Sequence, residues 1–153
     1  MKFLLVIGLL LTASGAAPEQ ADRPLPQWKL NLAKSTFDPG PPPRSTTTTV
    51  FAAGRYIKVV STIVDARGHV SIIEYRVAAD GEEVPVKGAQ AYDSLTMKSI
   101  DANTTEATRR KKGKIVQVST RVTSADGNTA TFTTVGTDER GRKVRDVTVF
   151  ERQ

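Results

Sequence analysis

The stretch Lys114-Ile-Val-Gln-Val-Ser-Thr-Arg-Val-Thr-Ser-Ala-Asp-Gly-Asn-Thr-Ala-Thr-Phe-Thr-Thr-Val-Gly-Thr137 contains two strand-like runs joined by a tight turn. The turn residues Asp126 and Gly127 favour the left-handed backbone of a hairpin. In the first run three valines alternate with polar residues: Val116, Val118 and Val122 against Gln117, Ser119, Arg121 and Thr123. Such alternation is typical of a strand with one buried and one solvent-facing side. We therefore expect an antiparallel hairpin that buries its valine face.

The same combination of a β-rich run and a short turn recurs from residue 46 to the C-terminus. About nine such runs follow one another at roughly ten-residue spacing. They are residues 46–53, 55–64, 69–78, 83–86, 92–100, 104–111, 114–123, 129–137 and 142–151. Loops this short make successive strands pair as antiparallel neighbours, so the runs predict a meander. No window has an apolar stripe of helical period, and we expect no helix beyond a turn near residues 34–37.

Closure is the expected fate of so long a meander. Open edges would invite aggregation, so the class predicted is all-β, with the meander closed or nearly closed into a barrel of about eight to ten strands. The nineteen threonines fit a sheet whose inner face is partly polar. A β-sandwich is the alternative, because residues 78–91 are long enough for the extra connection that a Greek key requires.

The N-terminus has the order of a secretory signal. Lys2 precedes an apolar run of about nine residues, and small residues follow up to Ala17. A membrane-spanning helix needs roughly 20 apolar residues, so we predict a signal peptide over 1–17 and no transmembrane segment after its removal. Residues 18–27 read as a flexible leader and 28–153 as a single domain. The chain has no cysteine, which excludes disulfides and favours a bacterial protein that is secreted or periplasmic.

The segment from Trp28 to Ser45 holds the only tryptophan and half of the eight prolines. Pro41 to Pro43 have no backbone donors and favour an extended conformation, so they cannot lie in the middle of a sheet. We expect this segment to cross a barrel end or follow an edge, with Trp28 and Phe37 plugging that end.

Three sequence elements carry a resemblance. They are Trp28-Lys-Leu-Asn-x-x-Lys-Ser-x-Phe-x-Pro-Gly-Pro-x-Pro-x-Ser45, Ser124-Ala-Asp-Gly-Asn128 and Val149-Phe-Glu-Arg152. With them the chain resembles a group of uncharacterised secreted bacterial proteins of lipocalin-like layout. A more distant similarity is to the calycin superfamily, in particular the fatty-acid-binding proteins. That resemblance implies a lipocalin-like barrel. It does not imply fatty-acid binding, because Thr148 replaces the carboxylate-binding arginine of the closing strand and Pro39 to Pro43 replace the helical lid.

Aromatic side chains are the candidate lining of a ligand pocket. Phe51, Tyr75, Phe132 and Phe150 are the residues expected there, although aromatic residues can also simply fill a barrel of this size. Four charged residues lie on strands rather than in turns: Glu74, Arg76, Arg121 and Asp146. We expect them to form cross-strand pairs on the outer face; pointing inward, they would mark a polar pocket.

A basic run suggests a second kind of partner. Arg109, Arg110, Lys111 and Lys112 lie together in a chain of net charge +6, and they are candidates for contact with an anionic envelope surface. The alternative is a solvated hairpin tip whose charges protect the sheet. Export makes a specific nucleic-acid partner unexpected.

Candidate catalytic and metal-ligating groups are absent from the sequence. His69 is the only histidine, it follows a turn, and no cysteine or calcium-type acidic spacing accompanies it. We therefore predict no cofactor, no metal and no enzymatic activity. The expected function is a secreted lipocalin-like protein that binds a small apolar or amphipathic molecule. A ligand-free envelope or interaction module using the basic hairpin is the alternative.

Overall fold

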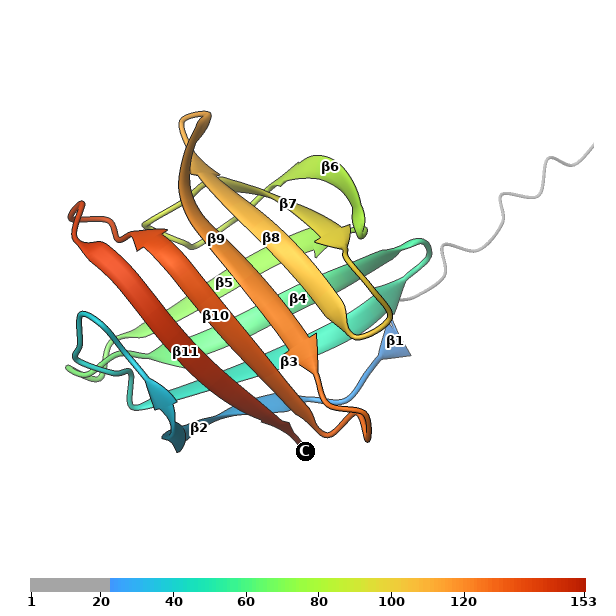
Figure 1. Cartoon of the computed structure of the whole chain (residues 1–153), viewed down its shortest axis with the longest axis horizontal. Helices are drawn as coiled ribbons and strands as arrows, with labels where there is room; N and C mark the ends of the chain where they lie inside the picture. Colours follow the sequence, from blue (N-terminus) through green and yellow to red (C-terminus); the bar gives the residue numbers. More distant parts are fainter. Residues whose placement is uncertain (1–22) are drawn as a thin grey trace, which may run out of the picture.

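The computed structural model describes residues 23–153, and the predicted signal peptide lies outside them. These residues form eleven strands and no helix (Figure 1). The strands are β1 (Arg23–Pro24), β2 (Trp28–Thr36), β3 (Ser45–Ala53), β4 (Tyr56–Val64), β5 (Val70–Val77), β6 (Asp80–Pro85), β7 (Ser94–Ser99), β8 (Thr104–Lys111), β9 (Lys114–Thr123), β10 (Thr129–Thr137) and β11 (Lys143–Arg152). Within this range no helix is long and apolar enough to cross a membrane.

The sheet is a single antiparallel meander. Its strand order is β5-β4-β3-β2-β11-β10-β9-β8-β7-β6, so pairing of β2 with β11 joins the first long strand to the last. The sheet curls into a nearly closed barrel, which confirms the predicted fold class over the sandwich (Figure 1). The nine predicted runs correspond to β3 to β11. The strand β2 was not foreseen, because it lacks alternation and depends on a partner more than 100 residues away in the chain.

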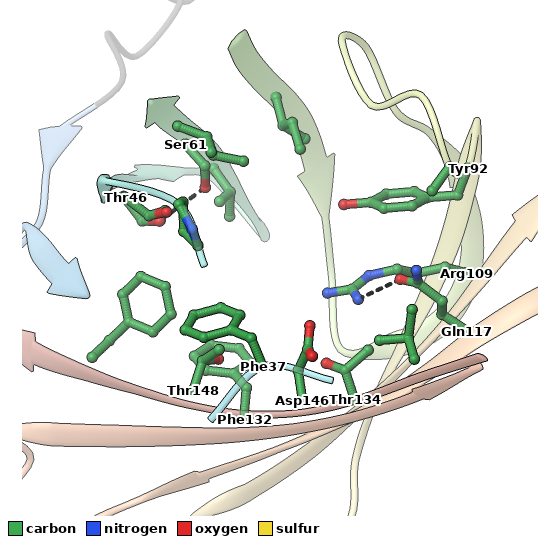
Figure 2. Close-up of a pocket in the computed structure, with 18 of the residues that line it drawn as sticks. Phe37, Thr46, Ser61, Tyr92, Arg109, Gln117, Phe132, Thr134, Asp146 and Thr148 are labelled. Carbon is green, nitrogen blue, oxygen red and sulfur yellow. Dashed lines mark hydrogen bonds between the residues drawn. The ribbon is translucent and has the colours of Figure 1, made fainter. Parts of the chain in front are cut away.

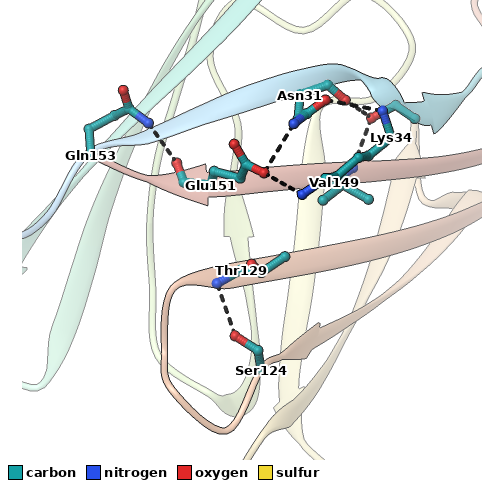
Figure 3. A network of polar contacts seen from close by, with 8 residues as sticks. Asn31, Lys34, Ser124, Thr129, Val149, Glu151 and Gln153 are labelled. Carbon is teal, nitrogen blue, oxygen red and sulfur yellow. Dashed lines mark hydrogen bonds and ion pairs between the residues drawn. The ribbon is translucent and has the colours of Figure 1, made fainter.

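The β2–β11 pairing is irregular, and the first sequence element explains why (Figure 3). Asn31 pairs with Val149 and Thr36 with Val147, so β2 carries a bulge between these pairs. The Ser35 hydroxyl accepts a hydrogen bond from the Val149 amide at 2.9 Å and donates to the Asn31 carbonyl at 2.6 Å. Its side chain therefore replaces a missing backbone partner.

A carboxylate on β11 completes this bulge. Glu151 Oε1 accepts hydrogen bonds from Asn31 Nδ2 at 3.0 Å and from Lys34 Nζ at 2.9 Å. The second element is also local structure, because the Ser124 hydroxyl accepts from the Thr129 amide at 3.0 Å across the β9–β10 turn (Figure 3). These polar residues of the three sequence elements stabilise the barrel's pairing rather than face its interior.

The barrel has one seam, between β5 and the chain that follows β6. A single bridge crosses it, in which the amides of Glu74 and Lys87 donate to each other's carbonyl at 3.0 and 2.9 Å. Gly88 follows directly, and a Cβ on this residue would lie 1.8 Å from the Ile72 carbonyl oxygen. The seam therefore depends on a glycine that lets two backbones approach closely.

The compact core lies to one side of the barrel, beside the seam. Its buried members are Val77, Val84, Val86 and Leu95, from β5, β6 with the residue after it, and β7. Burial there leaves the centre of the barrel free for a cavity.

The valine face of β9 is not the buried one, contrary to the sequence-based expectation. Gln117 and Ser119 are 8% and 2% exposed, whereas Val122 is 47% exposed. Alternation separates two faces but does not say which one is inside. The inward polar groups of β9 are satisfied by β10 and the residues at its end, because Ser119 shares a hydrogen bond with Thr134 and Gln117 Nε2 donates to the Thr137 carbonyl at 3.0 Å.

Residues 23–25, the described start of the predicted flexible leader, are paired with the sheet. Arg23 and Pro24 form β1 and pair with Ala52 and Phe51, and the Leu25 amide donates to the Val50 carbonyl at 2.8 Å. Residues 23–25 therefore lie along β3.

Candidate functional site

A cavity of about 1040 Å³ occupies the barrel interior (Figure 2). Strand residues that alternate inward form its wall. At one end it is lined by four loops, which we call the loop end: residues 37–43, 65–67, 90–92 and 138–142. They lie together because every second connection of a meander falls at the same end. At the other end Leu25, Pro26 and Trp28 line the cavity.

Trp28 and Phe37 do not form one plug. Trp28 is the first residue of β2 and Phe37 follows its last residue, so Trp28 lines the far end and Phe37 lies at the loop end. Pro39, Pro41 and Pro43 line the cavity with Phe37 at the loop end.

One part of the wall is apolar. Phe132 and Phe150 meet edge to face, with ring centroids 5.5 Å apart and planes at 73°. Aliphatic side chains continue this surface across the cavity, namely Val50, Ile57, Val59, Ile73 and Met97.

Some hydroxyl groups of the wall form hydrogen bonds across strands. Thr48 and Ser61 share a hydrogen bond of 2.9 Å across β3 and β4, and Ser119 and Thr134 share one of 2.9 Å across β9 and β10. Cross-strand pairs of this kind make a polar surface tolerable in a barrel interior.

Arg109 and Arg121 line the cavity, and within residues 23–153 neither has a carboxylate partner. Arg109 donates to Gln117 Oε1 at 3.0 Å and lies 5.0 Å from the Tyr92 ring centroid, while its buried Nε has no partner within residues 23–153 (Figure 2). The Arg121 guanidinium lies 5.5 Å from the Trp28 ring and 6.0 Å from that of Phe132. Burial lowers the pKa of Arg121. The interior is therefore cationic.

Tyr75 also lines the cavity. Burial and the neighbouring Tyr92 raise the pKa of its phenol to about 12, although Arg109 and Arg121 act to lower it. At neutral pH the hydroxyl is protonated and can donate a hydrogen bond into the cavity.

A carboxyl group of β11 also faces the cavity. Asp146 pairs with Thr134 across β10 and β11, and it accepts a hydrogen bond from the Asp38 amide at 2.9 Å (Figure 2). Burial raises the pKa of Asp146 above its ordinary value, and this outweighs the hydrogen bond that lowers it. The charged form is therefore disfavoured in the folded protein.

Replacing Asp146 with asparagine is expected to raise the thermal unfolding midpoint at pH 8. The amide keeps the acceptor for Asp38 and removes the desolvated charge. Because the folded-state pKa is raised, the wild-type carboxyl regains its proton as the pH falls through that pKa. The advantage of Asp146→Asn should therefore shrink on acidification, which a series of melting curves between pH 8 and pH 4 measures.

Asp126 supplies the opposite control. Hydrogen bonds from the Ser124 hydroxyl and the Asn128 amide lower its pKa. Its charge therefore stabilises the fold above the unfolded-state pKa, and that gain is lost as the pH falls through the folded-state pKa. Asp126→Asn should lower the midpoint at pH 8. A destabilising Asp146→Asn at that pH would contradict the assignment.

Three of the four predicted pocket residues meet in the cavity. Tyr75, Phe132 and Phe150 line it. Phe51 does not, because its neighbour Val50 points inward and alternation turns Phe51 to the outer face, where it pairs with Pro24.

The strand charges divide between the two faces. Glu74 lies outside, 3.5 Å from Lys58. Arg121 and Asp146 line the cavity, so the expectation of outer pairs was wrong for both. The sequence held a signal for Asp146, because its even spacing from Phe150 puts both side chains on one face of β11. Arg121 lies opposite Phe132 in the β9–β10 pair.

The basic run is not one patch. Arg109 turns into the cavity, where sequence reasoning did not place it. Arg110 is half-buried, and its Nη1 has no partner in the part of the chain that the structure describes. Lys111 and Lys112 lie at the β8–β9 hairpin tip, and the Lys112 amide donates to the Asp93 carboxylate at 3.0 Å.

Fold and site together define a nearly closed antiparallel barrel with a cationic internal cavity. Among residues 23–153 no cluster of three or more histidine, cysteine, aspartate or glutamate side chains is arranged to hold a metal ion. Comparison with family models, curated proteins and solved structures finds no match to this chain.

Proposed function

We propose that this protein, exported through the signal peptide expected at residues 1–17, binds one small amphipathic molecule inside the barrel. The observation that carries the proposal is the cavity of about 1040 Å³. Ligand sites generally measure roughly 300–1,000 Å³, so this space suits a single small molecule. The aromatic side chains line the space without filling it.

The lining also has the composition of a binding site. Aromatic and aliphatic side chains form most of the surface, and a few polar groups converge within it, namely Tyr75, Arg109, Gln117 and Arg121. An apolar wall supplies affinity, while a small number of fixed polar groups orient a ligand. No observation favours the alternative of an interaction module, because the basic run divides between the cavity and the hairpin tip.

Trp28 provides the test, since it is the only tryptophan and lines the cavity. The neutral fluorophore N-phenyl-1-naphthylamine absorbs where tryptophan emits. Titration should give saturable one-to-one binding, with Trp28 emission lost to energy transfer. Non-saturating binding, or no binding of this probe or any amphiphile, would overturn the proposal.

A pair of identical substitutions locates the site. Thr148 on β11 lines the cavity. Thr133 on the neighbouring strand β10 is exposed on the outer face. Thr148→Phe should weaken probe binding by about tenfold, or about 1.4 kcal/mol, because the ring occupies ligand space. Thr133→Phe should leave binding unchanged. Equal effects of the two variants would place the probe elsewhere.

A further inference from the structure

We infer that the amphipathic ligand carries a doubly negative head group of the phosphate monoester type, held by Arg121 and Arg109. This inference rests on the proposed function and adds the chemical class of the ligand.

The first observation is the isolation of Arg121. A guanidinium has five N–H donors and no acceptor, and burying it without a partner is costly. Among the described residues no carboxylate and no hydrogen-bond acceptor pairs with Arg121, whose guanidinium lies near the rings of Trp28 and Phe132. Because Arg121 lines the cavity, its donors are available to a molecule bound there.

An exposed arginine of the same barrel behaves differently. Arg55, outside the cavity, lies 3.3 Å from Asp80 and 3.2 Å from Glu82, where pairing contributes little. Within the described residues Arg109 and Arg121 have no carboxylate partner, and a buried charge without one is costly.

Arg109 supplies the second cation. Its single side-chain hydrogen bond goes to the neutral Gln117 amide, and its Nε is buried with no partner within the described chain. Tyr75, Arg109 and Arg121 all line this cavity, so β5, β8 and β9 each supply it with hydrogen-bond donors. Both arginines also lower the pKa of Tyr75.

Charge balance then selects the ligand. Across the whole lining six arginines face four carboxyl groups, an excess of two positive charges. A phosphate monoester carries about −1.5 to −2 at pH 7 and three acceptor oxygens, which suits two guanidinium groups and a phenol. The apolar wall at Phe132 and Phe150 adjoins Arg121, so the head group continues into a hydrocarbon chain.

The experiment compares decyl phosphate with decyl sulfate and 1-decanol as competitors of N-phenyl-1-naphthylamine. Phosphate and sulfate esters share a tetrahedral head and differ in charge. Decyl phosphate should bind at least about tenfold more tightly than decyl sulfate, and 1-decanol more weakly than both. Equal affinities of the two esters would overturn the doubly negative head group while leaving the proposed function standing.

Inorganic phosphate is the further arm. It should bind far more weakly than decyl phosphate, because it lacks the chain that contacts the apolar wall. Equal binding of the two would overturn the amphipathic ligand, and with it the proposed function. Failure of all four compounds and of the probe would overturn both proposals.

Variants assign the head group to its residues. Arg121→Gln and Arg109→Gln should each weaken decyl phosphate at least about tenfold, since charge-assisted hydrogen bonds are lost, and leave 1-decanol within about twofold. Arg121→Lys should restore part of the loss. Arg55→Gln is the control, because Arg55 lies outside the cavity. A loss shared by 1-decanol would mean a structural role for the arginine and overturn its assignment.

Stability separates the two roles further. Arg121→Gln removes an unpaired, half-buried charge, so its thermal midpoint in the absence of ligand should not fall. A lower midpoint together with unchanged decyl phosphate affinity would contradict the inference.

Discussion

The variant Gly136→Ala is expected to lose about 4 kcal/mol or more of its unfolding free energy, which is among the largest effects of a single added methyl group. Gly136 has φ +146° and lies opposite Gln117 in the β9–β10 pair. A Cβ would lie 2.0 Å from the Val116 carbonyl oxygen and 2.7 Å from the Gln117 Cα. Both contacts are with backbone inside the sheet, so relief requires the two central strands to separate.

Gly113→Ala is the matched control for the backbone conformation. Gly113 has φ +77°, and a Cβ there meets nothing within 4 Å. It should cost only the roughly 1–2 kcal/mol of a left-handed L-residue. Urea unfolding of both variants measures the difference. If Gly136→Ala is no less stable than Gly113→Ala, the close approach of β9 and β10 is contradicted.

The variant Gly88→Ala is expected to open the seam of the barrel and lose about 3 kcal/mol. Its Cβ would lie 1.8 Å from the Ile72 carbonyl oxygen, so the segment after β6 must move away from β5. The two Glu74–Lys87 hydrogen bonds next to it would break. The loss should be smaller than at Gly136, because the moving side of the contact is a loop rather than a central strand.

Hydrogen exchange locates this effect. The Glu74 and Lys87 amides should exchange faster in Gly88→Ala. The amides that pair β3 with β4 should keep the same order of protection factors as in the wild type. Gly113→Ala is again the control, since φ at Gly113 and Gly88 is +77° and +81°. Unchanged exchange at Glu74 and Lys87 would show that the seam does not depend on Gly88.

Most of the barrel was predictable because its information is local. Turn residues such as Asp126 and Gly127 mark the hairpins, and short connections force neighbouring strands to pair. The exception is β2. In its pairing with β11 the Ser35 hydroxyl accepts a hydrogen bond from the Val149 amide in place of a backbone carbonyl, and Glu151 accepts one from Asn31 in the bulge. Such a contact between chain ends leaves no periodic signal.

The site was predictable only in part. Tyr75, Phe132 and Phe150 are large aromatic residues on strands, and they do line the cavity. Phe51 has the same sequence character and lies outside, because its inward neighbour is Val50. Arg109 looked like one member of a solvated basic run, yet its position opposite Gln117 turns it inward.

The amino-acid sequence by itself determined the number and spacing of β3 to β11, their antiparallel order and the two-residue alternation along each of them. These properties depend on turn chemistry and on the backbone of each strand. Only the tertiary structure decided which face is the inside, so that Gln117, Arg121 and Asp146 line a cavity while Val122 meets solvent. The physical reason is that alternation is symmetric between two faces. Curling the sheet breaks that symmetry, and closure through β2 and β11 then encloses Arg109 and Arg121, which have no carboxylate partner among residues 23–153.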